Sequence, residues 1–210
     1  MTAAEILLRS GVAALPVDMG MIAQAHGVKL MSYESCAECY DMDVQRMYRE
    51  ISTLGFSFSD EEGYVAVINH NACGKLRRRW TMAHELAHIL LGHVNADIKR
   101  MEERCERSAD SLAAELLAPL TVLHFCGVSS AEEIGRLCGI SGQASEIRFR
   151  QLQEMRRNST ALHRQGKGTA FVQCESDRML LECFMPFISE YITRRSAHDG
   201  YAEHLRNMGR

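Results

Sequence analysis

Two histidines four residues apart, with a glutamate between them, place the strongest constraint on how this chain folds. His84, Glu85 and His88 form a His-Glu-x-x-His motif. On a helix, positions i and i+4 share a face, so both imidazoles can bind one Zn²⁺. Glu85 directly follows the first histidine, where its carboxylate can reach a water molecule at the metal without being a ligand. The motif therefore predicts a helix that carries a catalytic metal site.

The residues around the motif indicate that this helix is buried. Apart from the motif residues and Thr81, the positions from 80 to 91 are apolar: Trp80, Met82, Ala83, Leu86, Ala87, Ile89, Leu90 and Leu91. Thr81 is a candidate N-cap, and Gly92 is a candidate C-terminal stop. The alternative is a core helix whose histidines have ordinary hydrogen-bond partners. Burying unsatisfied polar groups is costly, and one zinc ion would satisfy both histidines together.

A second helix is predicted to supply the third ligand. Residues 102–118 are rich in alanine and leucine and end at Pro119. Catalytic zinc takes three protein ligands and leaves one position open, and His₂Glu is a common set. Glu106 and Asp110 are spaced i, i+4, so Glu106 can bind the metal while Asp110 holds a ligand histidine through its other ring nitrogen. Glu115 is the alternative third ligand, but it lies about 180° around the helix from Glu106, so both cannot face the ion.

In these two segments the chain resembles the ImmA/IrrE family of metallopeptidases. The matching stretches are residues 77–93 and 106–119, and weaker similarity runs from about Leu15 to about Arg156. The chain departs from the family pattern at two positions: Leu112 stands in place of the usual phenylalanine and Ala118 in place of the usual methionine. Neither change affects the proposed ligands. The resemblance implies a zincin-like peptidase whose acidic pair on the second helix is similar to that of thermolysin. It also implies a protein substrate, a transcriptional repressor that often controls a mobile element or a stress response.

The remaining pattern predicts an α+β, zincin-like fold with a small sheet packed on the motif helix. Helices are expected over residues 2–10 and 17–26, a strand over 28–33, and a short helix or loop over 43–53. Residues 56–59 and 64–69 alternate around a turn and predict a β-hairpin. In zinc peptidases an edge strand commonly binds substrate as an added strand. The residues nominated for this role are Tyr64, Val65, Ala66, Val67, Ile68 and Asn69.

The C-terminal part is predicted to be helical. Residues 130–139 form a capped amphipathic helix, a turn follows at 140–142, and a second helix covers 143–153, which is the layout of a helix-turn-helix. If this unit contacts DNA, Gln143, Ser145 and Arg148 are the base-reading candidates. The alternative, which we favour, is that both helices pack on the peptidase part, because nearby glutamates offset the arginines. The predicted division is a metallopeptidase domain over 1–125, the helix-turn-helix-like segment over 126–165, and a tail over 166–210 whose apolar stretch 179–192 docks as a helix or forms a dimer contact.

Composition argues against several other classes of protein. The formal net charge of −3 disfavours a strongly electrostatic binder of nucleic acid or membranes. Neither a signal peptide nor an apolar run long enough to cross a membrane is apparent, so a cytoplasmic protein is expected. The eight cysteines are then expected to be free thiols, and Cys36 and Cys39 are expected to be exposed rather than a zinc knuckle or redox pair. His93 is interpreted as a helix-end histidine.

These inferences predict a zinc-dependent endopeptidase. His84, His88 and Glu106 hold the ion, and Glu85 acts first as general base toward water and then as proton donor to the leaving amine. Tyr48, Tyr64 and His70 remain open as candidates for the donor to the oxyanion. The expected partner is a small helix-turn-helix repressor encoded nearby. The alternative is a non-catalytic zinc-containing regulator that binds DNA or a partner through residues 130–156.

Overall fold

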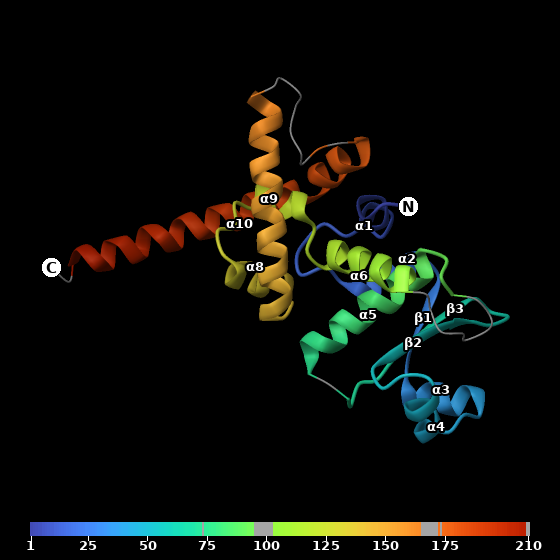
Figure 1. Ribbon diagram of the computed structural model, residues 1–210. Coiled ribbons are helices and arrows are strands. Elements are labelled where there is room, and N and C mark those ends of the chain that lie inside the picture. The colour runs from blue at the N-terminus through green and yellow to red at the C-terminus, as the bar shows by residue number, and fades with distance from the viewer. Residues whose placement is uncertain (73, 95–102, 165–171, 173, 209–210) are drawn as a thin grey trace.

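The protein combines one small sheet with many helices, as the sequence predicts. The structure, a computed structural model, describes residues 1–72, 74–94, 103–164, 172 and 174–208 (Figure 1). In chain order the elements are α1 (Ala3–Arg9), α2 (Met19–Ala25), β1 (Val28–Ser32), α3 (Tyr33–Tyr40), α4 (Val44–Glu50), β2 (Gly55–Ser59), β3 (Tyr64–Ile68), α5 (Lys75–Leu90), α6 (Glu103–Leu117), α7 (Leu120–Phe125), α8 (Ala131–Cys138), α9 (Gly142–Arg164) and α10 (Glu175–Met208). No helix in these described ranges is both long enough and apolar enough to cross a bilayer.

The three strands lie in the order β1-β3-β2. The hairpin of β2 and β3 is antiparallel, as expected, and β1 is parallel to β3. The turn between β2 and β3 is stabilised by Asp60, whose Oδ1 accepts hydrogen bonds from the backbone N–H groups of Glu62 and Gly63. The predicted strand over 28–33 is confirmed as β1.

The expectation of an edge strand at residues 64–69 is wrong. β3 is hydrogen-bonded to β1 along one side and to β2 along the other, so Tyr64–Ile68 is the central strand of the sheet. A substrate cannot be added to a strand whose two edges are already paired. Asn69 is also buried, and its side-chain amide donates to the carbonyl of Thr53. The outer edges of the sheet belong to β1 and β2.

The motif helix α5 begins earlier than the sequence suggests. Thr81 is not its N-cap but lies inside the helix and is buried, whereas the cap is Gly74. Two arginines hold the first turns of α5 against the backbone of distant segments. Arg78 donates to the carbonyl of His70, and Arg79 donates to the carbonyl of Val17. The predicted stop at Gly92 is confirmed, since its φ of +72° is the left-handed conformation that ends helices at glycine.

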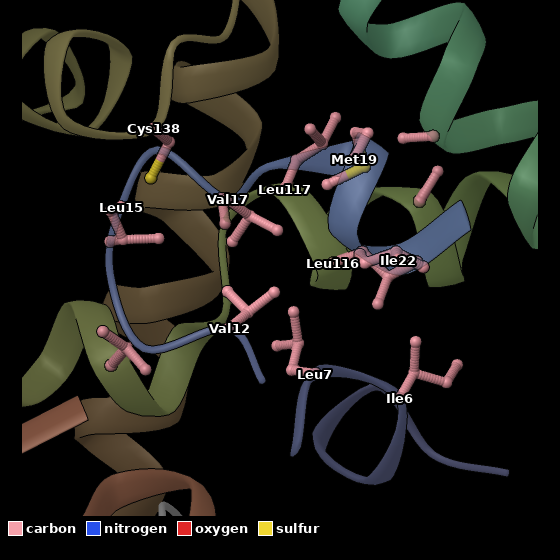
Figure 2. Close-up of a cluster of buried hydrophobic side chains, with 14 of the residues drawn as sticks. Ile6, Leu7, Val12, Leu15, Val17, Met19, Ile22, Leu116, Leu117 and Cys138 are labelled. Carbon is pink, nitrogen blue, oxygen red and sulfur yellow. The ribbon is translucent and has the colours of Figure 1, made fainter. Parts of the chain in front are cut away.

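The main hydrophobic core joins the N-terminal segment to helices from the middle and end of the chain. Figure 2 shows side chains of this cluster from α1, the following loop, α2, α6 and α8: Ile6, Leu7, Val12, Leu15, Val17, Met19, Ile22, Leu116, Leu117 and Cys138. The same cluster contains Leu180, Phe184 and Ile188 of α10, which confirms that this apolar stretch docks as a helix. The division into 1–125, 126–165 and 166–210 stays a prediction. One hydrophobic core includes residues from all three parts.

The helices α8 and α9 have the predicted order, but two of the proposed base-reading residues are inaccessible. Ser145 is 2% exposed and its hydroxyl donates to the carbonyl of Ser141. Arg148 is 5% exposed, and its guanidinium donates to Glu115 and to the carbonyl of Ala118. The face of α9 that carries these side chains packs into the protein. Ser145 and Arg148 therefore cannot read bases, which agrees with the favoured alternative that these helices pack on the rest of the protein, whereas Gln143 is exposed.

Gly55 sets how closely β2 approaches the motif helix. A Cβ atom at residue 55 would lie 2.5 Å from Cγ2 of Thr81 and 3.0 Å from the carbonyl oxygen of Val67. Such distances are too short for carbon contacts, so any larger residue would force the strand and the helix apart.

We therefore expect Gly55→Ala to lower the free energy of unfolding by about 1–3 kcal/mol, the usual effect of overpacking. Gly142→Ala is the control, because a Cβ at residue 142 meets nothing within 4 Å. Urea unfolding of both variants gives the comparison. Equal stability of the two variants would contradict the close contact between β2 and α5.

Candidate metal centre

The two histidines of the motif converge on one point, as their spacing on α5 predicts. Nε2 of His84 lies 3.0 Å from Nε2 of His88. His88 is buried, and His84 is partly exposed. Burial, with His84 and His93 nearby, lowers the pKa of His88 to about 4. Its imidazole is therefore neutral near pH 7, which is the form that binds metals.

The helix α6 brings a carboxylate to the same point. The oxygens of Glu106 lie 3.3 Å from Nε2 of His84 and 3.6 Å from Nε2 of His88. Ligand atoms of these three residues all lie within 4.8 Å of one another, and the Glu106 side chain is 46% exposed, so one side of the cluster is open.

The spacing of these donor atoms fits a tetrahedral zinc ion. With bonds of about 2.05 Å, two ligands of such an ion are about 3.3 Å apart. The two Nε2 atoms are 3.0 Å apart, and they lie 3.3 Å and 3.6 Å from Oε2 and Oε1 of Glu106, so each separation is close to this value. Two neutral imidazoles and one carboxylate are also a donor set found in catalytic zinc sites. The residues present therefore fit a zinc ion with an open fourth position.

Each histidine is oriented by a partner on its other ring nitrogen. Oδ1 of Asp110 lies 3.0 Å from Nδ1 of His84, in the position that the i, i+4 spacing with Glu106 predicts. Nδ1 of His88 lies 3.2 Å from Nδ1 of His93, whose Nε2 is 3.5 Å from the Ser108 hydroxyl. If His88 uses Nε2 for a metal, its Nδ1–H donates to His93, and His93 donates through Nε2–H to Ser108. His93 thus has a role beyond ending the helix, which sequence spacing alone did not suggest.

Glu85 is buried beside this cluster. Only 8% of the residue is exposed, and its Oε2 accepts a hydrogen bond of 2.9 Å from the hydroxyl of Ser57 on β2. Burial raises the pKa of the Glu85 carboxyl to about 7, although His84 and Ser57 act in the opposite direction. Sequence reasoning missed Ser57. The pattern that could have indicated it is the alternation of Phe56 and Phe58 with two serines, which places the serines on the face of the strand opposite the phenylalanines.

Glu115, the alternative third ligand, is held elsewhere. Its Oε2 forms an ion pair with the buried Arg148, and its Oε1 accepts from the backbone N–H of Leu120. Glu106 and Glu115 thus face different neighbours, as the helical geometry predicts. The geometry brings Glu106, and not Glu115, to the histidine pair.

The remaining candidates lie in different surroundings. The ring of Tyr48 stacks on Tyr33 in a second core cluster, with centroids 5.2 Å apart. Tyr64 is at the first position of β3 and is 40% exposed, and His70 is exposed just after that strand. None of these facts selects the oxyanion donor, which stays open.

The cysteine predictions are partly right. All seven cysteines in the described ranges are free. Cys39 is exposed as expected, but Cys36 is fully buried, because residues 33–40 form the unpredicted helix α3 and turn Cys36 into the second cluster.

The two glutamates of α6 should respond differently to neutralisation. We expect Glu106→Gln to lose zinc binding with little change in stability. We expect Glu115→Gln to keep zinc but to lower the free energy of unfolding by about 1–3 kcal/mol, because a charged hydrogen bond to Arg148 is weakened. Metal content by mass spectrometry and urea unfolding separate the two effects. Loss of zinc from Glu115→Gln alone would show that the wrong ligand has been assigned.

The partner of His88 should affect metal affinity. We expect His93→Leu to weaken zinc binding by about 10- to 100-fold, because the acceptor for Nδ1–H of His88 is lost. His93→Asn should retain more affinity, since its amide oxygen can take the place of Nδ1. Competition with a chelating dye measures both, and His70→Leu, an exposed histidine outside these contacts, is the control. Equal affinity in His93→Leu and the parent would refute the role of His93.

Comparison with known proteins agrees with this site. The family model for Peptidase M78, described as the IrrE N-terminal-like domain, matches residues 37–150, more than half of the chain. The match includes α5, α6 and every residue of the cluster described above. No curated protein matches the chain significantly. The match confirms the resemblance found in the sequence: the chain belongs to the IrrE N-terminal-like family of peptidases.

Proposed function

We propose that this protein is a zinc-dependent endopeptidase that cleaves or otherwise inactivates a transcriptional repressor. Membership of a peptidase family supports a metallopeptidase-type function. The observation that carries the proposal is the convergence of His84, His88 and Glu106, whose ligand atoms all lie within 4.8 Å of one another. Three protein ligands would leave the ion a fourth position for water, which is the arrangement of catalytic rather than closed structural zinc sites.

In this proposal His84, His88 and Glu106 hold the ion, and Asp110 and His93 fix the two imidazoles. When bound, zinc would lower the pKa of the attacking water and polarise the scissile carbonyl. The identity of the metal is part of the proposal. Zinc is favoured because a set of two imidazoles and one carboxylate is a standard zinc donor set.

Glu85 is the proposed general base. Ser57 donates to Oε2 of Glu85, and the carboxylate keeps free lone pairs that could accept the proton from water. The raised pKa suits this role, because a carboxyl that titrates near neutrality can take a proton and then return it. The proton held by Glu85 would next pass to the nitrogen of the leaving amine.

The strand β2 is a better candidate than β3 for holding the substrate backbone. It is an edge strand, and its residue Ser57 contacts Glu85. A peptide that paired with the outer edge of β2 would therefore run beside the proposed base. This replaces the expectation that placed the substrate on Tyr64–Asn69.

The repressor substrate rests on the family resemblance. An endopeptidase among many other proteins needs a selective target, and a small helix-turn-helix repressor encoded nearby is the proposed one. Cleavage of such a repressor would release the genes that it controls. The alternative of a non-catalytic regulator that binds DNA through residues 130–156 gains no support, because Ser145 and Arg148 are buried.

The proposal predicts that Glu85→Gln removes cleavage but not metal. We expect the rate of repressor cleavage to fall by about 10²- to 10⁴-fold, as for loss of a general base, with an unchanged zinc content. Gel analysis of the candidate repressor, incubated with each zinc-loaded protein, measures the rate. Glu154→Gln, which removes an exposed glutamate of α9, is the matched control. Cleavage at the same rate by Glu85→Gln would refute the peptidase assignment.

A further inference from the structure

A groove lies between the first turns of α5 and the turn that joins α8 to α9. Its volume is about 430 Å³, within the range of pockets that bind small molecules or side chains. It is lined by Leu76, Arg77, Trp80, Ile140, Gln143 and Ile147, with Ser141 and Ala144. In Figure 1 the N-terminal end of α9 lies beside the N-terminal end of α5.

The lining is apolar and open to solvent. Leu76 is 45% exposed and Ile147 is 44% exposed, although both are large aliphatic side chains. Leu76 and Trp80 are four residues apart on one helix, and Ala144 and Ile147 are three apart on the other, so each helix presents one row of apolar groups. Exposed apolar residues that gather in a groove mark binding surfaces more often than isolated ones do.

The rim of the groove is positively charged. The neighbouring arginines are engaged, because Arg78 donates to His70 and Arg79 donates to Val17. Arg77 is exposed and has no ion pair with any residue that the structure describes. Gln143 and Ala144, in the first turn of the 23-residue helix α9, also line the groove, so the positive end of that helix dipole lies next to it. Glu146 is exposed on α9 but is not part of the lining. A ligand with an acidic group beside an apolar one matches this surface.

The groove lies on the same side of α5 as the metal cluster. Arg77 precedes His84 by seven residues and His88 by eleven, and both intervals return to one face of a helix. Seven residues correspond to about 10.5 Å along the axis. An extended peptide that ran along α5 would advance about 3.3 Å per residue, which would put a side chain in the groove about three residues from the cluster.

We propose that this groove is a specificity subsite for the substrate polypeptide. It accepts a large aliphatic or aromatic side chain that is followed or preceded by aspartate or glutamate, about three residues from the bond to be cleaved. The acidic group pairs with Arg77, and the apolar side chain packs between Leu76, Trp80 and Ile147. The role in cleavage rests on the proposed peptidase function, whereas binding of such a peptide does not.

Trp80 is the only tryptophan of the chain, so its fluorescence reports on the groove directly. The experiment uses the full-length Glu85→Gln protein and two dodecapeptides of glycine and serine, one with a central Leu-Glu pair and one with Leu-Lys. We expect saturable changes in Trp80 emission, with the Leu-Glu peptide bound about two- to fivefold more tightly, as for an exposed ion pair. Adding Arg77→Glu should reverse the preference. Adding Arg157→Glu, an equal change of charge farther along α9, should not.

Two results would overturn the subsite: equal affinity for the two peptides, or the same effect from Arg77→Glu and Arg157→Glu. Failure of the peptidase function would look different. The protein would then still prefer the Leu-Glu peptide, and Arg77→Glu would still reverse this preference. Only the Glu85-dependent cleavage of a repressor would be absent. If the repressor were cleaved normally but the Leu-Glu and Leu-Lys peptides bound equally well, only the subsite would be rejected.

Discussion

The packing of α6 along α5 is the contact on which the rest of the site depends. It brings the carboxylate of Glu106 within 3.6 Å of both His84 and His88, and it places Asp110 against the outer nitrogen of His84. In the unfolded chain water would solvate these side chains separately, and nothing would hold them together. Held by two buried helix faces, they form a cluster in which two imidazoles and a carboxylate point at one position, and a divalent ion would satisfy all three.

The surroundings of this cluster give neighbouring groups different roles. Glu85 is enclosed, is hydrogen-bonded to Ser57 and has a raised pKa, so it suits the movement of a proton. Glu106 is partly exposed and faces the histidines, so it suits a ligand. Glu115 is tied to Arg148 and holds α9 against α6. Three glutamates within about thirty residues thus differ in function because the packing around each one differs.

The local parts of this account could be predicted from sequence, and the long-range parts could not. Helical periodicity was sufficient to place His84 with His88, and Glu106 with Asp110, on shared faces. The helix α5 begins before Thr81 because the contacts that lengthen it reach back to His70 and Val17. The hairpin pattern cannot show that β3 is a central strand, because its second neighbour, β1, lies far upstream in the chain. The burial of Arg148 depends on Glu115 and Ala118, which no local pattern connects to it.

The most direct test of the central claim is X-ray absorption at the zinc edge of the purified, zinc-loaded protein. The account predicts a four-coordinate ion with nitrogen and oxygen neighbours at about 2.0–2.2 Å, and with imidazole scattering from two histidines. A sulfur neighbour at about 2.3 Å, which would bring a cysteine such as Cys105 into the site, would contradict it.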